Sequence, residues 1–78
     1  MLTKNVFKHR PEITNANSVF LGWNYNSNNN ITNCPANNGS LISFGHGSIC
    51  VQLFIGYQNS GMWYRDITNN ATAEWIKI

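Results

Sequence analysis

The sequence predicts a small all-β domain, and three observations support this prediction. Two runs rich in β-branched and aromatic residues, 48–57 and 62–67, flank a short polar turn. A third run, 74–78, carries a tryptophan and ends the chain. Helical periodicity does not extend beyond about one turn anywhere in the sequence. We therefore expect a small antiparallel β domain that contains a hairpin and a terminal strand.

The first half of the chain alternates between strand and loop signals. Alternating apolar residues predict a strand over 18–25, and the asparagine-rich stretch 26–30 then predicts a loop. The Asn-Asn-Gly sequence at 37–39 is a strong turn signal, because glycine takes a positive φ without steric penalty. We expect the next strand over 40–44 and a flexible break at the Gly-His-Gly sequence 45–47.

The hairpin register follows from the turn that we expect at Asn59-Ser60-Gly61, a type I turn with a glycine bulge. That register places Ile55 opposite Arg65 and gathers most of the apolar side chains on one face. We expect the following residues to form the core face: Ile49, Val51, Leu53, Ile55, Tyr57, Trp63 and Ile67. The other face would carry Cys50, Gln52, Phe54, Met62, Tyr64 and Asp66.

Arg65 is the anomaly of this register, because it falls on the apolar face. A buried guanidinium is unfavourable by several kcal/mol unless it is paired and hydrogen-bonded. Arg65 either snorkels at the sheet edge with its stem on Trp63, or bonds to a carbonyl, to Gln52 or to Asp66 of a neighbouring chain. We expect a structural role for Arg65 and not a catalytic one.

The composition indicates a single domain with an uncharged polar surface. A chain of 78 residues buries only about 60% of its unfolded surface, so a lone monomer would be marginally stable. Charged residues make up 10% of the chain, against about 25% in ordinary globular proteins. A surface rich in asparagine suits contact with neutral polyols such as glycans. It equally suits a fibre that avoids nonspecific charge contacts. The third interpretation is that the asparagine content reflects a simple codon or lineage bias.

Several function classes are disfavoured. The net charge of +2 is too small for a phosphate-binding stripe, so we expect no nucleic-acid partner. The longest apolar stretch, 49–55, is far too short for a transmembrane helix, so we expect no membrane insertion. Two cysteines make no disulfide framework, and we expect Cys34 and Cys50 to be reduced thiols that behave as small buried hydrophobes.

Catalytic and metal-binding patterns are missing from the sequence. Three carboxylates, with no histidine beside them and no nucleophile elbow, predict neither a glycosidase pair nor a triad. His9 and His46 are too few for a metal site within one chain. Three copies of His46 on a threefold axis could share a metal, but an exposed loop histidine is the simpler interpretation. We expect no enzyme, no catalytic residue, no cofactor and no metal.

Binding chemistry has better support. Glycan sites combine an aromatic platform for the apolar sugar face with amides for the hydroxyl groups. Two stretches offer this combination, and their candidate receptor-binding residues are Trp23, Tyr25, Asn26, Asn28, Tyr57 and Asn59. The alternative is that Trp23 and Tyr25 are core aromatics and that the asparagine run is a solvated loop.

The order of the motifs resembles a known family. The chain carries Gly22-Trp-Asn-Tyr, Asn33-Cys-Pro and Gly39-Ser-Leu-Ile-Ser, then a strand with Gln52, a strand with Trp63-Tyr-Arg65, and Trp75-Ile-Lys near the end. Over residues 13–78 this order resembles the C-terminal tips of phage and phage-derived tail fibres, the pyocin-knob-like tips. Residues 1–12 would then be a lead-in or shaft connector. These tips often end in a tryptophan pair, and Cys34 and Cys50 are not part of their pattern.

The resemblance implies a non-enzymatic, receptor-binding fibre tip. Its expected partners are two further copies of the chain in an intertwined homotrimer, an upstream fibre shaft and a host cell-surface saccharide. Its expected location is the virion tail fibre, assembled in the bacterial host cytoplasm. Gln52, Trp63, Arg65 and Trp75 would have structural or interface roles. The alternatives are a trimerisation or folding cap without a ligand, and a monomeric lectin-like domain.

The homotrimer also has a quantitative motivation. The chain is 42% hydrophobic and has three Trp, three Tyr and four Phe, which need more cover than a private core of this size readily provides. Association would also protect the strand edges from aggregation. We expect Ile76 and Ile78 to pack near the threefold axis or against the neighbouring chain.

Overall fold

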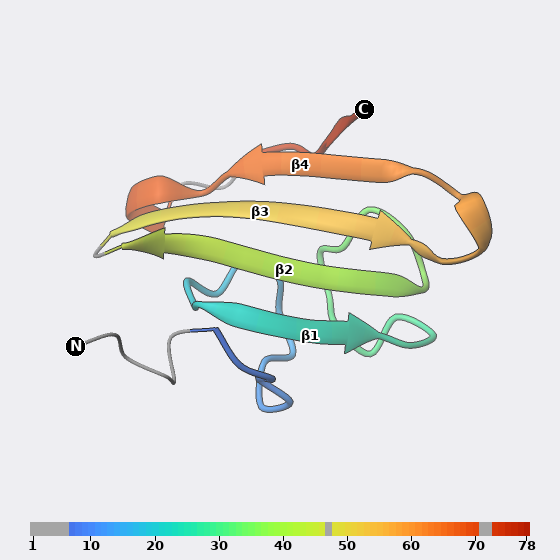
Figure 1. Cartoon of the computed structure of the whole chain (residues 1–78), viewed down its shortest axis with the longest axis horizontal. Helices are drawn as coiled ribbons and strands as arrows, with labels where there is room; N and C mark the ends of the chain where they lie inside the picture. Colours follow the sequence, from blue (N-terminus) through green and yellow to red (C-terminus); the bar gives the residue numbers. More distant parts are fainter. Residues whose placement is uncertain (1–6, 47, 71–72) are drawn as a thin grey trace.

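The computed structural model describes residues 7–46, 48–70 and 73–78, apart from the side chains of His46 and Asn70, and its centre is one antiparallel five-stranded sheet (Figure 1). The strands lie in chain order: β1 (Gly22–Asn26), β2 (Gly39–His46), β3 (Ile49–Gly56), β4 (Met62–Asp66) and β5 (Ile76–Lys77). Two short 3-10 turns complete the elements, η1 (Tyr57–Asn59) and η2 (Thr68–Asn70). The all-β prediction is confirmed. Half of the expected lead-in segment, residues 1–6, lies outside the described residues.

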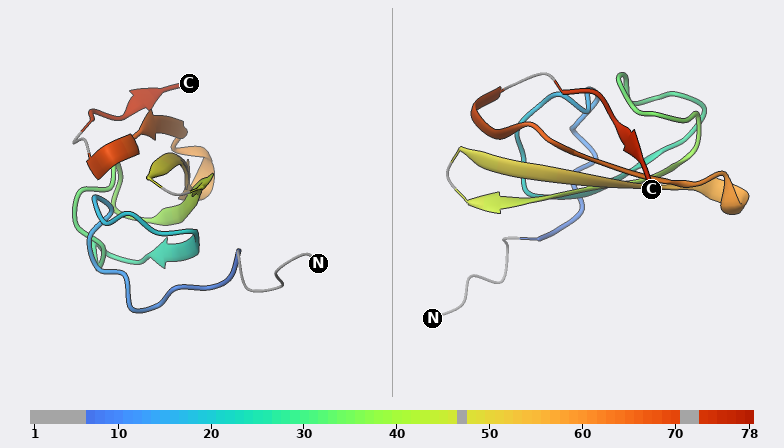
Figure 2. Two further views of the ribbon diagram at one scale, coloured as in Figure 1. Left: turned by 90° about the vertical axis from the view of Figure 1, so that its left-hand side faces the viewer. Right: turned by 90° about the horizontal axis from the view of Figure 1, so that it is seen from above.

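The connecting segments cover one face of the sheet. Seen edge-on in the right-hand view of Figure 2, the loops between β1 and β2 and before β5, and most of the segment before β1, lie on one side of the strands. The start of the described chain lies on the other side, where Phe7 stacks on Phe44 and His9 stacks on Trp23. They bury a core cluster of Ala16, Phe20, Ile31, Leu41 and Phe54. Partly buried side chains pack against it, including Ile13, Cys34, Trp63 and Trp75. We call this side the covered face.

The opposite side of the sheet is apolar and largely uncovered. Because paired residues on antiparallel strands point to the same side, the register defines this set directly. We call it the open face: Trp23 and Tyr25 on β1, Ser40, Ile42 and Phe44 on β2, Ile49, Val51, Leu53 and Ile55 on β3, Met62, Tyr64 and Asp66 on β4, and Ile76 on β5. One row, Trp23, Ile42, Leu53, Tyr64 and Ile76, crosses all five strands.

The first strand is shorter than predicted, because β1 begins at Gly22 and residues 18–21 lie outside it. Phe20 turns into the core instead. The segment before Pro11 runs beside β1, where the Trp23 N–H donates to Lys8 O at 3.0 Å and the Arg10 N–H donates to Trp23 O at 2.8 Å. A Cβ at position 22 would collide with Lys8 O, so this close approach requires glycine there.

The predicted hairpin register was wrong by three residues. β3 and β4 pair Gln52 with Arg65, Phe54 with Trp63 and Ile55 with Met62. The loop is longer than expected, because the Gly56 N–H donates to Gly61 O at 2.8 Å and Gln58 and Asn59 both have left-handed backbones, with φ of 56° and 61°.

An odd shift in register exchanges the two faces of one strand relative to its partner. Cys50, Gln52 and Phe54 therefore lie on the covered face, together with Trp63 and Ile67. The residues of β3 that were expected in the core, Ile49, Val51, Leu53 and Ile55, lie on the open face, and Tyr57 is exposed in the loop. The prediction was correct for β4 and reversed for β3. The Gly-His part of the expected break at 45–47 belongs to β2, and Gly47 lies outside the described residues.

Candidate functional site

The asparagine-rich loop and the β3–β4 hairpin meet at one end of the sheet. Asn38 joins them, because its Oδ1 accepts from the Asn28 N–H at 3.0 Å and its backbone O accepts from the Tyr57 N–H at 3.1 Å. The Asn29 N–H donates to Asn37 O at 3.0 Å in the same region. The asparagine loop that follows the first candidate stretch and the hairpin tip of the second therefore lie on one surface. We call it the strand-end shelf, residues 27–38 with 56–61.

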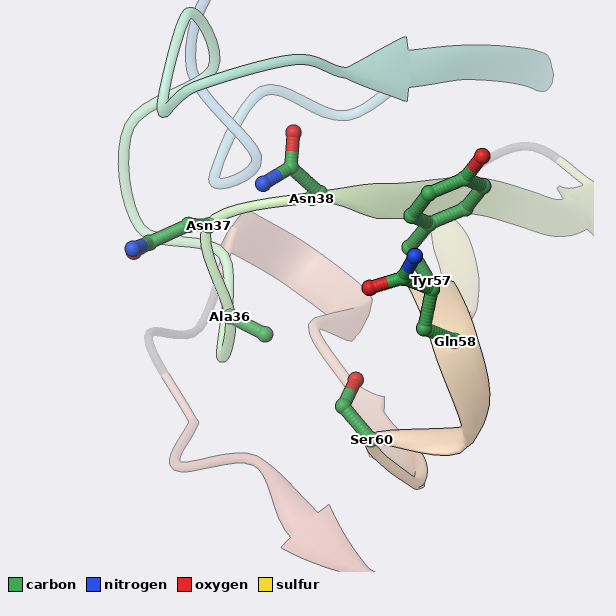
Figure 3. A pocket seen from close by; sticks show the side chains of 6 residues that line it. All are labelled: Ala36, Asn37, Asn38, Tyr57, Gln58 and Ser60. Atoms are coloured by element: carbon green, nitrogen blue, oxygen red, sulfur yellow. The ribbon is translucent and has the colours of Figure 1, made fainter.

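The strand-end shelf contains a small, open hollow of about 180 Å³. Pockets for drug-sized ligands run from about 300 to 1,000 Å³, so this hollow suits one small ring at most. Figure 3 shows Ala36 facing Gln58 and Ser60 across it, while the Asn37 side chain points away. The lining residues are Ala36, Asn37, Asn38, Tyr57, Gln58 and Ser60, none of which carries a charge.

One tyrosine ring, that of Tyr57, lines this hollow, and the ring of Tyr25 lies against it. Tyr57 is 59% exposed, and its ring meets that of Tyr25 edge-to-face with centroids 6.4 Å apart. Asn28 and Asn59 are exposed in the same two loops. Tyr57, Asn59, Tyr25 and Asn28 therefore lie in the region expected of a receptor-binding surface.

Asn26 does not belong to that surface, contrary to the expectation. It is fully buried, its Nδ2 donates to Ala36 O at 2.8 Å, and its Oδ1 accepts from the Ile31 N–H at 2.9 Å. Both ends of the amide are used to fold the loop. Asn26 is therefore part of the scaffold beneath the shelf.

Other asparagines also have structural roles. Asn28, Asn29 and Asn33 have left-handed backbones, with φ of 52°, 63° and 66°, a conformation that asparagine tolerates better than most residues. Asn24 is buried, and its Nδ2 donates to Ile13 O at 2.9 Å. Backbone conformation and buried hydrogen bonds thus account for much of the asparagine content, in addition to any role of asparagine in binding.

Trp23 lies outside the strand-end shelf. Its ring is 38% exposed on the open face and stacks on His9, with centroids 4.3 Å apart. The sequence left open whether Trp23 and Tyr25 are exposed or belong to the core, and the structure gives the same answer for both. Neither packs in the core, and both occupy the open face of β1.

Arg65 is buried at the centre of the covered face, with 4% of its surface exposed. Its Nε donates to Gln52 Oε1 at 2.7 Å, and its terminal nitrogens donate to Ala16 O and Ala73 O, each at 3.0 Å. Gln52 in turn donates to Ala16 O at 2.8 Å and to Ser43 Oγ at 3.1 Å. Arg65 is therefore not a snorkelling side chain. Its partners are a glutamine and carbonyls, as one interpretation required, but they belong to the same chain.

Trp75 completes this buried centre. The guanidinium carbon of Arg65 lies 4.3 Å from the centroid of the Trp75 ring, a cation–π contact that offsets part of the burial of the charge. The Trp75 Nε1–H donates to Asn33 O at 2.8 Å, which fastens the last segment of the chain to the loop before β2. Burial lowers the pKa of Arg65 below its usual range.

Trp63 and Trp75 both contact Phe54, with ring centroids 5.9 and 6.1 Å away. The four residues that the resemblance places in structural or interface roles thus lie together, around Phe54, on the covered face. We call Gln52, Arg65 and Trp75, with their carbonyl partners, the arginine centre.

Reactive side chains are sparse in the described parts of the chain. Residues 7–46, 48–70 and 73–78 contain no group of three His, Cys, Asp or Glu side chains able to hold a metal, and the His46 side chain lies outside the described residues. Cys34 and Cys50 are free thiols, as predicted, and burial raises the pKa of Cys34 to about 11. In the same residues, we find no helix that combines the length and apolarity required to span a bilayer.

The hollow of the shelf was only partly anticipated from the sequence. Asn37, Asn38 and Ser60 were treated as turn residues and not as candidates, and Ala36 was given no role. Turns that connect antiparallel strands at the same end of a sheet lie side by side, and this topology was the signal that would have grouped them. Comparisons with models of protein families, with curated proteins and with solved structures found no match for this chain.

Proposed function

We propose that the protein is the non-enzymatic, receptor-binding tip of a phage tail fibre, and that it recognises a neutral saccharide on the host cell surface. The motif order over residues 13–78 supports the family. The strand-end shelf supports the ligand class. In this proposal the tip is a homotrimer that continues from an upstream shaft and belongs to the virion tail fibre assembled in the bacterial host cytoplasm.

The observation that carries the ligand class is the chemistry of the shelf. Tyr57 offers an exposed ring, and the Gln58 amide and Ser60 hydroxyl lie beside it at the hollow. Sugars present C–H faces that pack on aromatic rings, and hydroxyls that need both donors and acceptors. The residues lining the hollow carry no charge, so a phosphate or carboxylate ligand would have no cationic partner there.

The backbone around the hollow is fixed before any ligand binds. Asn38 bonds both loops, and Asn26 holds the loop from below. A pre-organised site loses less conformational entropy on binding than a mobile one. This geometry favours a recognition surface over an unstructured connection.

A second candidate function is a trimerisation or folding cap that binds no ligand. The open face favours it, because apolar side chains that are exposed in one chain are available to bury against other chains. The two candidates differ in whether the strand-end shelf has a ligand.

The test uses a saccharide array followed by titration of the best neutral sugar. Tyr57→Ala and Gln58→Gly should each weaken binding at least tenfold, whereas Tyr57→Phe, which keeps the ring, should change it less. Glycine suits position 58 because the backbone there is left-handed. Asn69→Gly is the matched control, since Asn69 is exposed and left-handed but lies in η2, outside the shelf. Binding that survives both shelf changes, or no binding of the unaltered protein to any saccharide, would contradict the glycan proposal.

A further inference from the structure

We propose that copies of this chain associate through the open face of the sheet. The inference rests on the proposed homotrimer and deepens it, because it identifies the surface that the copies share. It comes from the uncovered side of the sheet, which Figure 1 shows in front of the covering loops.

The exposed apolar area on this face is larger than a monomer normally tolerates. Nine of its large side chains are between 36% and 54% exposed: Trp23, Tyr25, Phe44, Ile49, Val51, Ile55, Met62, Tyr64 and Ile76. Side chains of this kind present on the order of 200 Å² when free, so the nine together expose roughly 800 Å². The largest apolar patch of a typical monomer is about 300–600 Å². A stable interface buries about 800 Å² on each partner, which this face supplies.

The chemistry of the face suits another copy of itself. Among the strand residues defined as the open face, Asp66 is the one with a charge, and its Oδ1 accepts from the Thr68 N–H at the end of the sheet. An apolar, nearly uncharged surface offers nothing to an ionic partner, but it is complementary to a second surface of the same kind. Two such sheets pack face to face as the layers of a β-sandwich do.

Association through the strand edges is less favoured. Beside β1, Lys8 and Arg10 already bond to both backbone groups of Trp23. At the other edge, β5 has two residues, Ile76 and Lys77, so it offers only a short edge with which a strand of another chain could pair. The edges are therefore partly blocked. On the face, Phe7 stacks on Phe44 and His9 stacks on Trp23, but both of the rings beneath them stay more than a third exposed.

A threefold arrangement also fits the width of the sheet. Five strands at about 4.8 Å spacing make a sheet about 20 Å wide, and three such sheets around an axis stand about 6 Å from it. Packed sheets lie about 10 Å apart, so each stands about 5 Å from the plane between them. Side chains from three open faces would therefore meet at the axis without leaving a channel. Leu53, on the central strand, would lie nearest the axis, and Ile76 would meet the β1 edge of the neighbouring copy.

The experiment measures the mass of the full chain by sedimentation equilibrium over a range of concentrations. Leu53→Lys places a charge in the middle of the face and should weaken association at least tenfold. Val51→Thr is a milder change that keeps the shape and strand preference of the residue, and it should weaken association less. Thr32→Lys is the matched control, because Thr32 is exposed in a loop on the covered side and should leave the mass unchanged. Circular dichroism checks that each variant is folded.

The outcomes separate this inference from the proposed function. A trimer that Leu53→Lys dissociates supports both the open face and the homotrimer. A dimer that the same change dissociates supports the open face and overturns the threefold assembly. An unaltered protein that stays monomeric at all concentrations, or an oligomer that folded variants of Leu53 and Val51 leave intact, overturns the inference. Saccharide binding by the shelf is measured separately, and its result does not depend on the outcome of this experiment.

Discussion

The two faces of this sheet reverse the usual distribution of polar and apolar side chains. The covered face buries an arginine, a glutamine and two asparagines, whereas the open face exposes tryptophan, tyrosine and isoleucine. Both faces belong to the same strands, so the difference does not come from strand propensity. It comes from what lies against each face: long loops on one side and, among the described residues, the short segment that carries Phe7 and His9 on the other (Figure 2).

The loops explain why polar side chains are buried. Irregular segments over a sheet leave backbone carbonyls that strand pairing cannot satisfy, and each must find a donor. Arg65 and Gln52 supply donors to Ala16, and Arg65 also supplies one to Ala73. The polar centre is therefore the means by which long loops are held on the sheet. On the open face, Phe7 and His9 contact the sheet by ring stacking, and the apolar side chains of the strands stay exposed for association.

The arginine centre should give the largest effect on stability. Arg65→Ala removes three hydrogen bonds, leaves Gln52 Oε1 and Ala73 O without these donors and opens a cavity beside Trp75, whereas Ala16 O keeps the bond from Gln52. We expect a loss of about 4 kcal/mol or more in the free energy of unfolding, measured by urea denaturation. For a domain of this size, such a loss approaches its total stability.

Arg65→Lys is the control for charge. Lysine keeps the positive charge but lacks the planar guanidinium fork that reaches Gln52 and two carbonyls at once, so it should remain clearly less stable than the unaltered protein. If Arg65→Lys is as stable as the unaltered protein, charge alone accounts for the centre and the hydrogen-bond geometry is unimportant.

Adjacent residues on β3 compare the two faces directly. Phe54 is fully buried on the covered face, whereas Ile55 is 40% exposed on the open face. Phe54→Ala should lower the free energy of unfolding by about 3–4 kcal/mol, because it leaves a cavity in the core. Ile55→Ala should lower it by about 1 kcal/mol in the dissociated chain. Denaturation at several protein concentrations separates folding from association. If the two variants lose the same free energy of unfolding at the lowest concentration, the exposure of Ile55 on the open face is contradicted.

The sequence was sufficient for the fold class but not for the assignment of faces. The turn signals at 37–39 and 59–61 located the hairpins, and β-branched runs located β2, β3 and β4. The register failed because the more apolar face of β3 was assigned to the core. When a surface awaits other chains or the core is polar, hydrophobicity no longer identifies the buried side.

The candidate site shows the same limit. Tyr57 and Asn59 are exposed at a strand end, as the sequence indicated, but Asn26 is buried one residue beyond the exposed Tyr25. Alternation along β1 would have placed Asn26 with Asn24 on the side opposite Tyr25. Sequence alone does not tell which of these sides the loops cover, so it could not separate scaffold asparagines from binding ones.

Two asparagines, Asn26 at the end of β1 and Asn30 in the loop that follows, provide a test of this difference between scaffold and binding asparagines. The Oδ1 of Asn26 and that of Asn30 each accept a backbone N–H, from Ile31 at 2.9 Å and from Ser27 at 2.8 Å, but Asn26 is buried and Asn30 is exposed. Asn26→Ala leaves the Ile31 N–H and Ala36 O without partners, so we expect a loss of about 2–3 kcal/mol. Asn30→Ala should cost less than about 1 kcal/mol, because water replaces the bond. Thermal or urea unfolding measures both, and similar losses would contradict the scaffold role of Asn26.

The smallest effect concerns Cys34, whose thiol lies partly buried against the core cluster on the covered face. Burial raises its pKa from 9.0 to about 11, so the thiol is neutral at pH 8 and alkylation by iodoacetamide should be much slower than in the unfolded chain. The pKa of Cys34 is higher in the folded chain than in the unfolded chain. The thiol therefore makes its full contribution to the free energy of unfolding below about pH 9, and this contribution is lost as the pH rises toward 11. Cys34→Ala should therefore reduce the fall in stability between pH 9 and 11 while leaving the neutral range nearly flat.

Mass spectrometry after alkylation in denaturant, without reductant, should find label on both Cys34 and Cys50. A species with neither label would instead indicate a disulfide, and rapid labelling of folded Cys34 at pH 8 would show that the covered face opens there.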